Sequence, residues 1–425
     1  MGEDFLHFVW KFGLLDKNGL KTAAGENVEI ISPGTHNKDS GPDFTGAKIK
    51  IGEVLWAGNV EIHVKASDWL LHGHQNDKSY DSVILHAVAI NDVEITRMNT
   101  ETIPVITINY PKSIEQKYRE LADSSFDIPC KLYLPKITEV KIKHWLTRMA
   151  AERLEYKAEY IAELLKQTQS DFDRVLRRLL FRYFGFKVNA LPFELLAQNI
   201  PAVAKKYHAS LPTTEALLFG QAGFLDDELA EDDYYNALKR EYLFLKAKHG
   251  LNPMNKSLWK FARLRPYNFP TLRIAQMAAL LHKCDDLFDA VLNADDVREH
   301  IAVFEDVRAS EYWDTRYLFG KTVEKPLPKR IGRTAAELIA LNVTVPFMFA
   351  YARSKGDENL RERALNLLDK FKPESNSTIR NWAEAGIKAG NAAESQALLH
   401  LYAEYCSPRK CLQCAIGKIV VGDKQ

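Results

Sequence analysis

Acidic, imidazole and ammonium groups gather in two strand-like segments near the start of the chain. Asp43 follows a proline, and eighteen residues later Glu61, His63 and Lys65 alternate with apolar residues. Side chains two positions apart on a β-strand point to one face, so these three are expected on one surface. Oxygen ligands from Asp43 and Glu61 suit Mg2+ or Mn2+, which lowers the pKa of a bound water. Lys65 would stabilise the attacking hydroxide, and His63 would act as a base or a further ligand.

Two predicted strands position these residues. Apolar and polar residues alternate on both sides of Gly52, which predicts a β-hairpin with strands over 47–51 and 54–65. Further strands are predicted over 28–31, 83–89 and 103–108. Residues 83–89 are almost all apolar, as expected for a strand covered by helices on both faces of a sheet. Glu29, in the first of these segments, would complete the acidic metal-binding set.

Beyond residue 137 the apolar period changes to three and four, which predicts helices. The first helix is marked by Leu146, Ala150, Leu154, Ala158, Ile161 and Leu165. Others are predicted over 171–184, 214–219, 232–248, 270–282, 334–353, 359–370 and 379–405. The expected fold class is therefore an α+β multidomain chain. It has an α/β domain with a mixed sheet over 1–135, a large all-α domain over 136–405, and a cysteine-rich tail over 406–425.

Composition limits the classes of function. The 425 residues exceed one hydrophobic core, and 46% of them are apolar, which is enough to fill two or three domains. Fifty-seven basic and fifty-six acidic residues give a net charge of +1, so bulk charge does not favour nucleic acid or membranes. The first residues lack the basic region of a signal peptide, and the apolar run 345–350 is too short to cross a bilayer. We expect a cytoplasmic protein with no membrane partner.

Three of the five cysteines lie close together near the C-terminus. Cys406, Cys411 and Cys414 form a C-x4-C-x2-C pattern, which is typical of sites for Zn2+ or an iron–sulfur cluster. Such a site needs a fourth ligand. Cys130 is the first candidate, followed by His400 and Cys284. A metal bound there would join the tail to the end of the α/β domain and contribute folding free energy.

A second set of metal ligands follows the hairpin. His72 and His74, with Asp77 close behind, combine imidazole and carboxylate groups that suit zinc, manganese or iron. If they converge with His63, the chain is a histidine-ligated metallohydrolase.

Basic and aromatic residues interleave over 263–273. Arg263, Arg265 and Arg273 alternate with aromatic residues, a composition that suits phosphate contacts and base stacking. We expect these arginines to contact nucleic acid.

Pro42-Asp43 with Glu61-x-His63-x-Lys65 resembles the core of the PD-(D/E)XK nuclease superfamily. The resemblance covers only the N-terminal domain and implies a restriction-endonuclease-like fold. It also implies a magnesium-dependent nuclease acting on DNA or RNA, in which Asp43 and Glu61 hold the ion. The sequence departs from that pattern, because His63 stands where the superfamily has its lysine. The alternative is a nucleic-acid- or protein-binding module on a catalytically degenerate nuclease fold.

Two further resemblances concern the whole chain and its cysteines. The segments 41–44, 56–63, 67–69 and 72–75 resemble a bacterial family without an assigned function that is common in Bacteroidetes. The cysteines are similar to those of nucleases of the recombination and CRISPR-adaptation type, where both ends of the chain hold an iron–sulfur cluster. In those nucleases the lone cysteine precedes the catalytic motif, whereas Cys130 follows it here.

Overall fold

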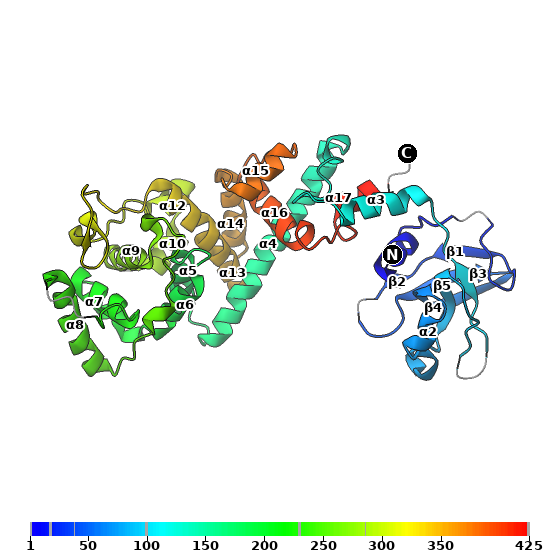
Figure 1. The fold of residues 1–425 in the computed structure, drawn as a ribbon, viewed down its shortest axis with the longest axis horizontal. Helices are drawn as coiled ribbons and strands as arrows, with labels where there is room; N and C mark the ends of the chain where they lie inside the picture. Colours follow the sequence, from blue (N-terminus) through cyan, green and yellow to red (C-terminus); the bar gives the residue numbers. More distant parts are fainter. Residues whose placement is uncertain are drawn as a thin grey trace. The chain divides into compact units, whose positions relative to one another are not determined.

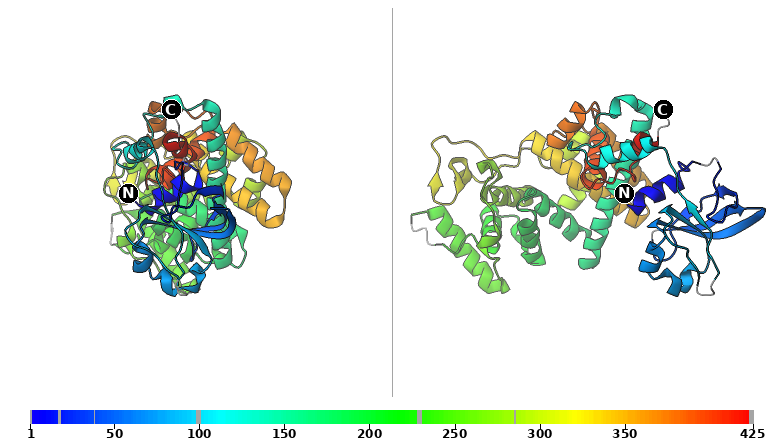
Figure 2. Two further views of the ribbon diagram at one scale, coloured as in Figure 1. Left: turned by 90° about the vertical axis from the view of Figure 1, so that its right-hand side faces the viewer. Right: turned by 45° about the vertical axis from the view of Figure 1, so that its right-hand side comes forward.

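The computed structural model describes residues 2–16, 19–37, 39–97, 101–227, 231–284 and 286–422. The chain forms two compact units. The first contains residues 1–145, 384–387 and 401–425, and the second contains 146–383 and 388–400. The division falls inside the long helix α4 (Glu139–Gln167). Figure 1 shows the sheet of the first unit in blue and the helices of the second in green to orange, and Figure 2 gives two further views.

A mixed sheet forms the centre of the first unit. Its strand order is β1 (Val28–Ser32), β3 (Phe44–Ile51), β4 (Val54–Lys65), β5 (Val83–Ile90) and β6 (Val105–Thr107), and β2 (Thr35–His36) pairs with β3. The pairs β1–β3 and β3–β4 are antiparallel, whereas β4–β5 and β5–β6 are parallel. The predicted hairpin is confirmed, because Ile51 pairs with Val54 around Gly52. The predicted mixed sheet is confirmed as well.

The crossover between β4 and β5 carries short helices and two histidines. Because parallel strands cannot be joined by a tight turn, the chain must cross one face of the sheet. It does so through α2 (Asp68–Leu71), η1 (His74–Asn76) and η2 (Lys78–Tyr80). Trp69 anchors this crossover, since it is 1% exposed and packs with Ala66, Val83 and Val88. The crossover is therefore held against the sheet beside β4, the strand that carries Glu61 and His63.

Other helices of the first unit were not anticipated from the sequence. These are α1 (Glu3–Lys11), which contacts β4, α3 (Lys112–Ala122), η3 (Leu134–Lys136) and α17 (Ala415–Gly422), whereas the π-helix η9 (Tyr402–Cys406) overlaps the end of the helix predicted over 379–405. In α1, five of nine side chains are buried, including Phe5, Leu6 and Trp10, and they form one apolar face of the helix. The last helix, α17, packs against α3 (Figure 1).

The second unit is almost entirely helical. Six predicted helices, over 171–184, 214–219, 232–248, 270–282, 334–353 and 359–370, are helical in the structure. The elements are α5 (Phe172–Phe184), α6 (Ala190–Asn199), η4 (Ala202–Tyr207), α7 (Leu211–Gln221), α8 (Asp233–His249), η5 (Lys256–Leu258), η6 (Pro266–Asn268), α9 (Pro270–Lys283), α10 (Leu287–Asn293), α11 (Val297–Ala302), η7 (Glu311–Thr315), β7 (Arg316–Leu318), β8 (Lys321–Thr322), α12 (Arg333–Ile339), η8 (Ala340–Thr344), α13 (Val345–Lys355), α14 (Glu358–Lys370), α15 (Ser377–Glu384) and α16 (Ala392–Leu401).

Two details of the second unit differ from the prediction. A two-stranded sheet of β7 and β8 interrupts the helices, so the unit is not strictly all-α. The single helix expected over 379–405 is also wrong, because α15 ends at Glu384 and α16 begins at Ala392. Gly386 lies between them with a φ of +96°, a left-handed conformation that ends helices.

Residues 333–355 form one continuous apolar helix made of α12, the π-helix η8 and α13. Among the described residues, this helix is long and apolar enough to cross a membrane. The apolar run 345–350, which by itself is too short to cross a bilayer, is therefore part of a longer apolar helix. However, 67% of its most apolar window is buried inside the protein, and Phe347 and Met348 are fully buried in the helical core. Packing in that core accounts for its apolar composition.

Close packing between α7 and α8 gives a first testable prediction. A Cβ atom at Gly220 would lie 2.1 Å from the Tyr242 ring, so Gly220→Ala must displace that buried side chain. We expect the free energy of unfolding to fall by about 1–3 kcal/mol, measured by chemical denaturation. Gly390→Ala is the matched control, since its Cβ would meet only the Glu394 carboxylate, at 3.4 Å. Equal stability of the two variants would contradict the prediction.

Candidate metal centre

Asp43 and Glu61 lie side by side where β3 begins. Strand pairing sets Phe44 opposite Val60, which brings the residue before β3 against the middle of β4. The backbone N–H of Asp43 donates to Glu61 Oε2 at 3.0 Å, and the backbone N–H of Ile62 donates to Asp43 Oδ2 at 2.9 Å. Glu61 is 4% exposed. The structure thus brings together the two carboxylates that the sequence analysis singled out.

Four histidines surround this carboxylate pair. His63 comes from β4, His72 and His74 from the crossover, and His86 from β5. One ring nitrogen from each of His63, His72 and His74 lies within 4.8 Å of the other two. His63 Nε2 is 3.1 Å from His72 Nδ1, and His63 Nδ1 is 2.8 Å from His86 Nε2. Because His72 is exposed while His63 is buried, the cluster reaches the protein surface at His72.

Glu61 contacts two of these imidazoles. Its Oε1 lies 3.3 Å from His74 Nε2 and 3.5 Å from His63 Nε2. Glu61 and His63 therefore share a face of β4, as the alternation of its residues predicts. The carboxylate is placed to act on any group held by the histidines.

Aromatic side chains orient the histidines. The Tyr80 ring stacks on His74 with centroids 3.8 Å apart, and Trp69 meets both His74 and His86 with centroids 5.3 Å apart. These contacts limit rotation of the imidazoles. A preset arrangement of ligands reduces the entropy lost when an ion binds.

Two residues of α1 also belong to the site. His7 Nε2 lies 3.1 Å from Asp43 Oδ2, and the charge of Glu3 acts on Asp43, His7 and His72. The sequence analysis missed both. The available signal was a pair of polar residues four positions apart, hence on one face, in a helix whose other residues are mostly apolar.

The electrostatics of the cluster favour neutral imidazoles. Burial lowers the pKa of His63 to about 3, and the neighbouring imidazoles of His86, His74 and His72 add to the shift. Burial likewise lowers the pKa of His86 to about 4 and lowers that of His74. A neutral imidazole keeps the lone pair that binds metals.

The two carboxylates shift in opposite directions. Burial raises the pKa of Glu61 to about 8, and the charge of Asp43 adds to this shift. Burial also pulls the pKa of Asp43 upward, but the contact with His7 and the N–H of Ile62 outweigh it and hold that pKa below its usual value. Negative charge is therefore retained at Asp43 and disfavoured at Glu61.

The donor set fits one transition-metal ion. Bonds of 2.0–2.1 Å to three nitrogens in tetrahedral geometry place those nitrogens about 3.3 Å apart. The separation between His63 and His72 is 3.1 Å, so these two rings already stand at ligand spacing. With its proton on Nδ1, His63 donates to His86 and turns the Nε2 lone pair towards the cluster. His86 then acts through His63, as a positioning residue.

Three other residues named from the sequence lie outside the cluster. Lys65 is exposed and its charge acts on Asp92, and within the described residues it forms no ion pair with Asp43 or Glu61. It is four residues from Glu61, which is roughly 13 Å along a strand. Glu29 is exposed, and its pairing partner on β3 is Lys50. Lys50 is seven residues after Asp43, which places the two residues roughly 23 Å apart along the strand. Asp77 caps η2 through Ser79. The structure thus does not bring Lys65 to the acidic pair or make Glu29 a ligand.

Comparison with protein families places the chain in one of them. A family model matches residues 3–377, most of the 425 residues. The chain belongs to the family described as "Protein of unknown function (DUF2851)". No curated protein and no solved structure matches it. The expected membership of a family without an assigned function is thereby confirmed.

The DUF2851 match includes the histidine cluster and excludes the cysteine-rich tail. The carboxylates and imidazoles of the candidate metal centre all lie within residues 3–377, whereas Cys406, Cys411 and Cys414 follow the matched region. The histidine cluster is therefore part of the region that defines the family.

The first unit of this DUF2851 chain also gathers four cysteines. Cys130, Cys406, Cys411 and Cys414 are free and each at most 7% exposed. Burial raises the pKa of Cys130 to about 12, and Cys414 and Cys411 add to the shift. Burial also raises the pKa of Cys406, with Cys130 the next contributor. The Cys130 sulfur is therefore close enough to those of the three C-terminal cysteines to interact with them, and ligation of a shared metal stays a prediction. The two other candidate ligands, His400 and Cys284, lie in the second unit, where His400 approaches Glu152 at 3.6 Å.

The arginines expected to contact nucleic acid differ in their surroundings. In the DUF2851 chain, Arg273 is 4.5 Å over the Phe186 ring and donates to Gln276 and Asn268. Burial lowers its pKa to about 10. Its contacts are internal, so the expected contact of Arg273 with nucleic acid has no support from the structure. Arg263 and Arg265 are exposed, and for them the contact stays a prediction.

Proposed function

We propose that this protein is a metal-dependent hydrolase of phosphodiesters, with the ion held by His63, His72 and His74. The observation that carries the proposal is the meeting of these three ring nitrogens within 4.8 Å beside the buried Glu61. The cluster is open to solvent at His72, which gives a substrate access. A histidine-ligated metallohydrolase requires this convergence, whereas a purely structural role for three histidines does not.

The ligands narrow the choice of ion. Imidazole nitrogen suits Zn2+, Mn2+ and Fe2+, whereas Mg2+ prefers six oxygens in octahedral geometry. Of the two ions expected from the sequence, Mn2+ therefore fits this cluster better than Mg2+. A bound ion of this kind lowers the pKa of a coordinated water and polarises a phosphoryl oxygen.

Glu61 is the general base in this proposal: burial alone favours its protonated form, and a cation held by the histidines would favour the ionised carboxylate that accepts a proton. Its carboxylate lies 3.3 Å from His74 and 3.5 Å from His63, next to the position of the ion. Water attacks the phosphorus, its proton passes to Glu61, and the bond from phosphorus to the leaving oxygen breaks. Asp43 positions Glu61 through its backbone N–H, and His7 holds the charge on Asp43.

The order of strands supports phosphodiesters as the substrate class. An antiparallel hairpin that carries two carboxylates, a helical crossover and a parallel strand follow one another, as in the PD-(D/E)XK nuclease core to which the motif is similar. On this basis we include a restriction-endonuclease-like fold and nucleic acid as substrate in the proposal. The remote position of Lys65 favours the second candidate, a nucleic-acid-binding module on a degenerate nuclease fold.

The test is metal-dependent hydrolysis by the full chain. Protein stripped with chelator and reloaded with Mn2+, Zn2+ or Mg2+ is assayed on bis(p-nitrophenyl) phosphate and on DNA and RNA oligonucleotides. We expect no hydrolysis without metal and recovery with Mn2+ or Zn2+. His72→Ala should lose both ion binding, measured by calorimetry, and activity.

His144→Ala is the matched control, because His144 is an exposed histidine on α4. It should behave as wild type. Hydrolysis that survives the chelator and His72→Ala would overturn the proposal. Binding of an oligonucleotide without hydrolysis under any metal would favour the binding module instead.

A further inference from the structure

The C-terminal cysteines lie on a compact loop. Cys406 ends the π-helix η9, and Cys411 and Cys414 lie in the turns that lead to α17. Backbone hydrogen bonds close these turns, from Arg409 N–H to the Cys406 carbonyl at 3.1 Å and from Cys414 N–H to the Cys411 carbonyl at 3.2 Å. The three side chains are therefore presented from a loop with a fixed path.

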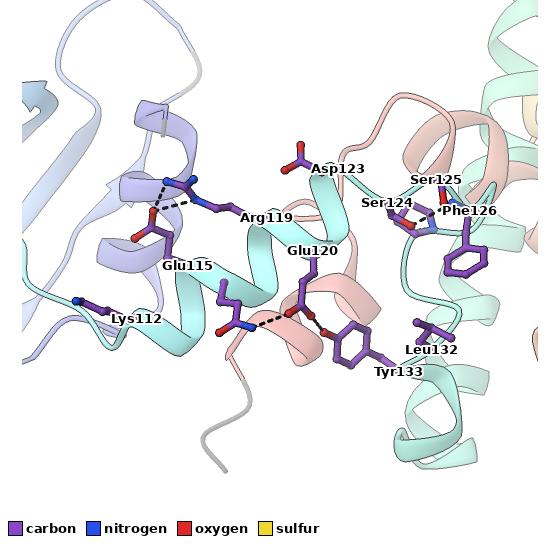
Figure 3. A pocket seen from close by; sticks show the side chains of 12 residues that line it. Lys112, Glu115, Arg119, Glu120, Asp123, Ser124, Ser125, Phe126, Leu132 and Tyr133 are labelled. Atoms are coloured by element: carbon purple, nitrogen blue, oxygen red, sulfur yellow. Dashed lines mark hydrogen bonds and ion pairs between the residues drawn. The ribbon is translucent and has the colours of Figure 1, made fainter.

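Arg409 ties this loop to the segment that precedes Cys130. Its guanidinium donates to the carbonyls of Ser124 and Phe126, both at 2.9 Å. Its φ is +58°, a costly conformation for a residue other than glycine. Figure 3 shows Ser124 and Phe126 on the loop that follows α3, beside a groove of about 930 Å³. The chain thus uses a charged, two-bond contact to bring Cys130 to the other three cysteines.

Packing on the other side of the loop is equally close. A Cβ at Gly417 would lie 2.1 Å from the Cys411 carbonyl oxygen, so α17 begins in direct contact with the cysteine loop. The backbone N–H groups of Ile416 and Gly417 hydrogen-bond to the sulfur of Cys414. Donors of this kind stabilise a thiolate, and they are among the features that tune iron–sulfur centres.

The distances between the sulfurs distinguish a site for a single metal ion from a site for a larger metal cluster. Zinc–sulfur bonds of 2.3 Å in tetrahedral geometry place sulfurs about 3.8 Å apart. The three histidines bring ring nitrogens within 4.8 Å of one another, whereas among the residues that the structure describes no three of these sulfurs come that close. Any three of the sulfurs are thus spaced more widely than the ligands of one zinc ion. A cluster of several iron and sulfide ions has a larger radius.

We propose that Cys130, Cys406, Cys411 and Cys414 ligate an iron–sulfur cluster that joins the C-terminal loop to the segment after α3. The site is separate from the histidine cluster and does not depend on the proposed hydrolysis. Metal–thiolate bonds between residues nearly three hundred positions apart form only in the folded chain, so the free energy of binding stabilises the first unit.

The test is metal analysis of the full chain purified without oxygen. We expect iron and acid-labile sulfide in comparable amounts, broad visible absorbance, and a Mössbauer spectrum typical of a cluster. Cys411→Ser should lose the iron, whereas Cys284→Ser should keep it, because Cys284 lies outside the first unit.

The wild-type spectra need no variant, so misfolding of Cys411→Ser does not prevent a decision. Stoichiometric zinc without sulfide would overturn the iron–sulfur assignment. Wild-type protein without iron or zinc, or iron retained in full by Cys411→Ser, would overturn the site.

Discussion

Hydrolysis by Glu61→Gln is expected to be on the order of 100- to 10 000-fold slower than by the wild type. The amide keeps the size of the side chain and can still accept the hydrogen bond from Asp43 N–H. It cannot take a proton from water. The measurement is kcat on bis(p-nitrophenyl) phosphate with saturating Mn2+ or Zn2+, together with the metal content of the variant.

Lys65→Met is the informative partner of that variant. In the PD-(D/E)XK pattern the lysine is essential, whereas in this structure Lys65 is exposed and acts on Asp92. We therefore expect its rate to remain close to the wild-type rate. A loss as large as that of Glu61→Gln would assign the catalytic role to Lys65. If Glu61→Gln lost its ion as well as its activity, Glu61 would be a ligand instead of the base.

Local patterns predicted the strands well because each carries its own signal. Alternation around Gly52 marks β3 and β4, and the apolar run over 83–89 marks β5. The same two-residue period placed Glu61 and His63 on one face, and they lie 3.5 Å apart. Where a prediction depended only on neighbours along one strand or one turn, the structure agrees with it.

Predictions failed where they depended on register or on distance along a strand. Lys65 shares a face with Glu61, yet it lies four residues further along β4, which places it beyond the site. Glu29 is acidic and on a strand of the same sheet, but its pairing with Lys50 places it at the opposite end of β3 from Asp43. Neither the pairing register nor the packing of α1, which delivers His7, can be read from the period of the residues.

The histidine cluster shows how topology completes a site. His72 and His74 are nine and eleven residues after His63, too far for a shared strand or helix face. The parallel pairing of β4 with β5 folds the intervening chain back over the strand that carries His63. The sequence could name these histidines as candidate metal ligands, and only the crossover brings their ring nitrogens within 4.8 Å of one another.

In the helical unit, stability is expected to fall steeply as the pH drops from about 6.5 to 4. His300 on α11 is fully buried. Burial, and next the charge of Arg363, lower its pKa from 6.5 to about 4, against weaker opposition from Asp296 and Asp295. Between these two values the unfolded chain binds a proton that the folded chain does not. Stability from this group is therefore complete above pH 6.5 and is lost as the pH falls, by about 3 kcal/mol in all.

The measurement is the free energy of unfolding of the full chain at pH 7 and pH 4, for wild type and His300→Leu. Carboxylates that titrate in the same range contribute to both proteins, so the difference between their pH slopes isolates His300. We expect the wild type to lose about 3 kcal/mol more than the variant. His144→Leu, at an exposed position, should keep the wild-type slope. Parallel slopes for wild type and His300→Leu would mean that His300 takes up its proton within the fold, at a pKa close to that of the unfolded chain.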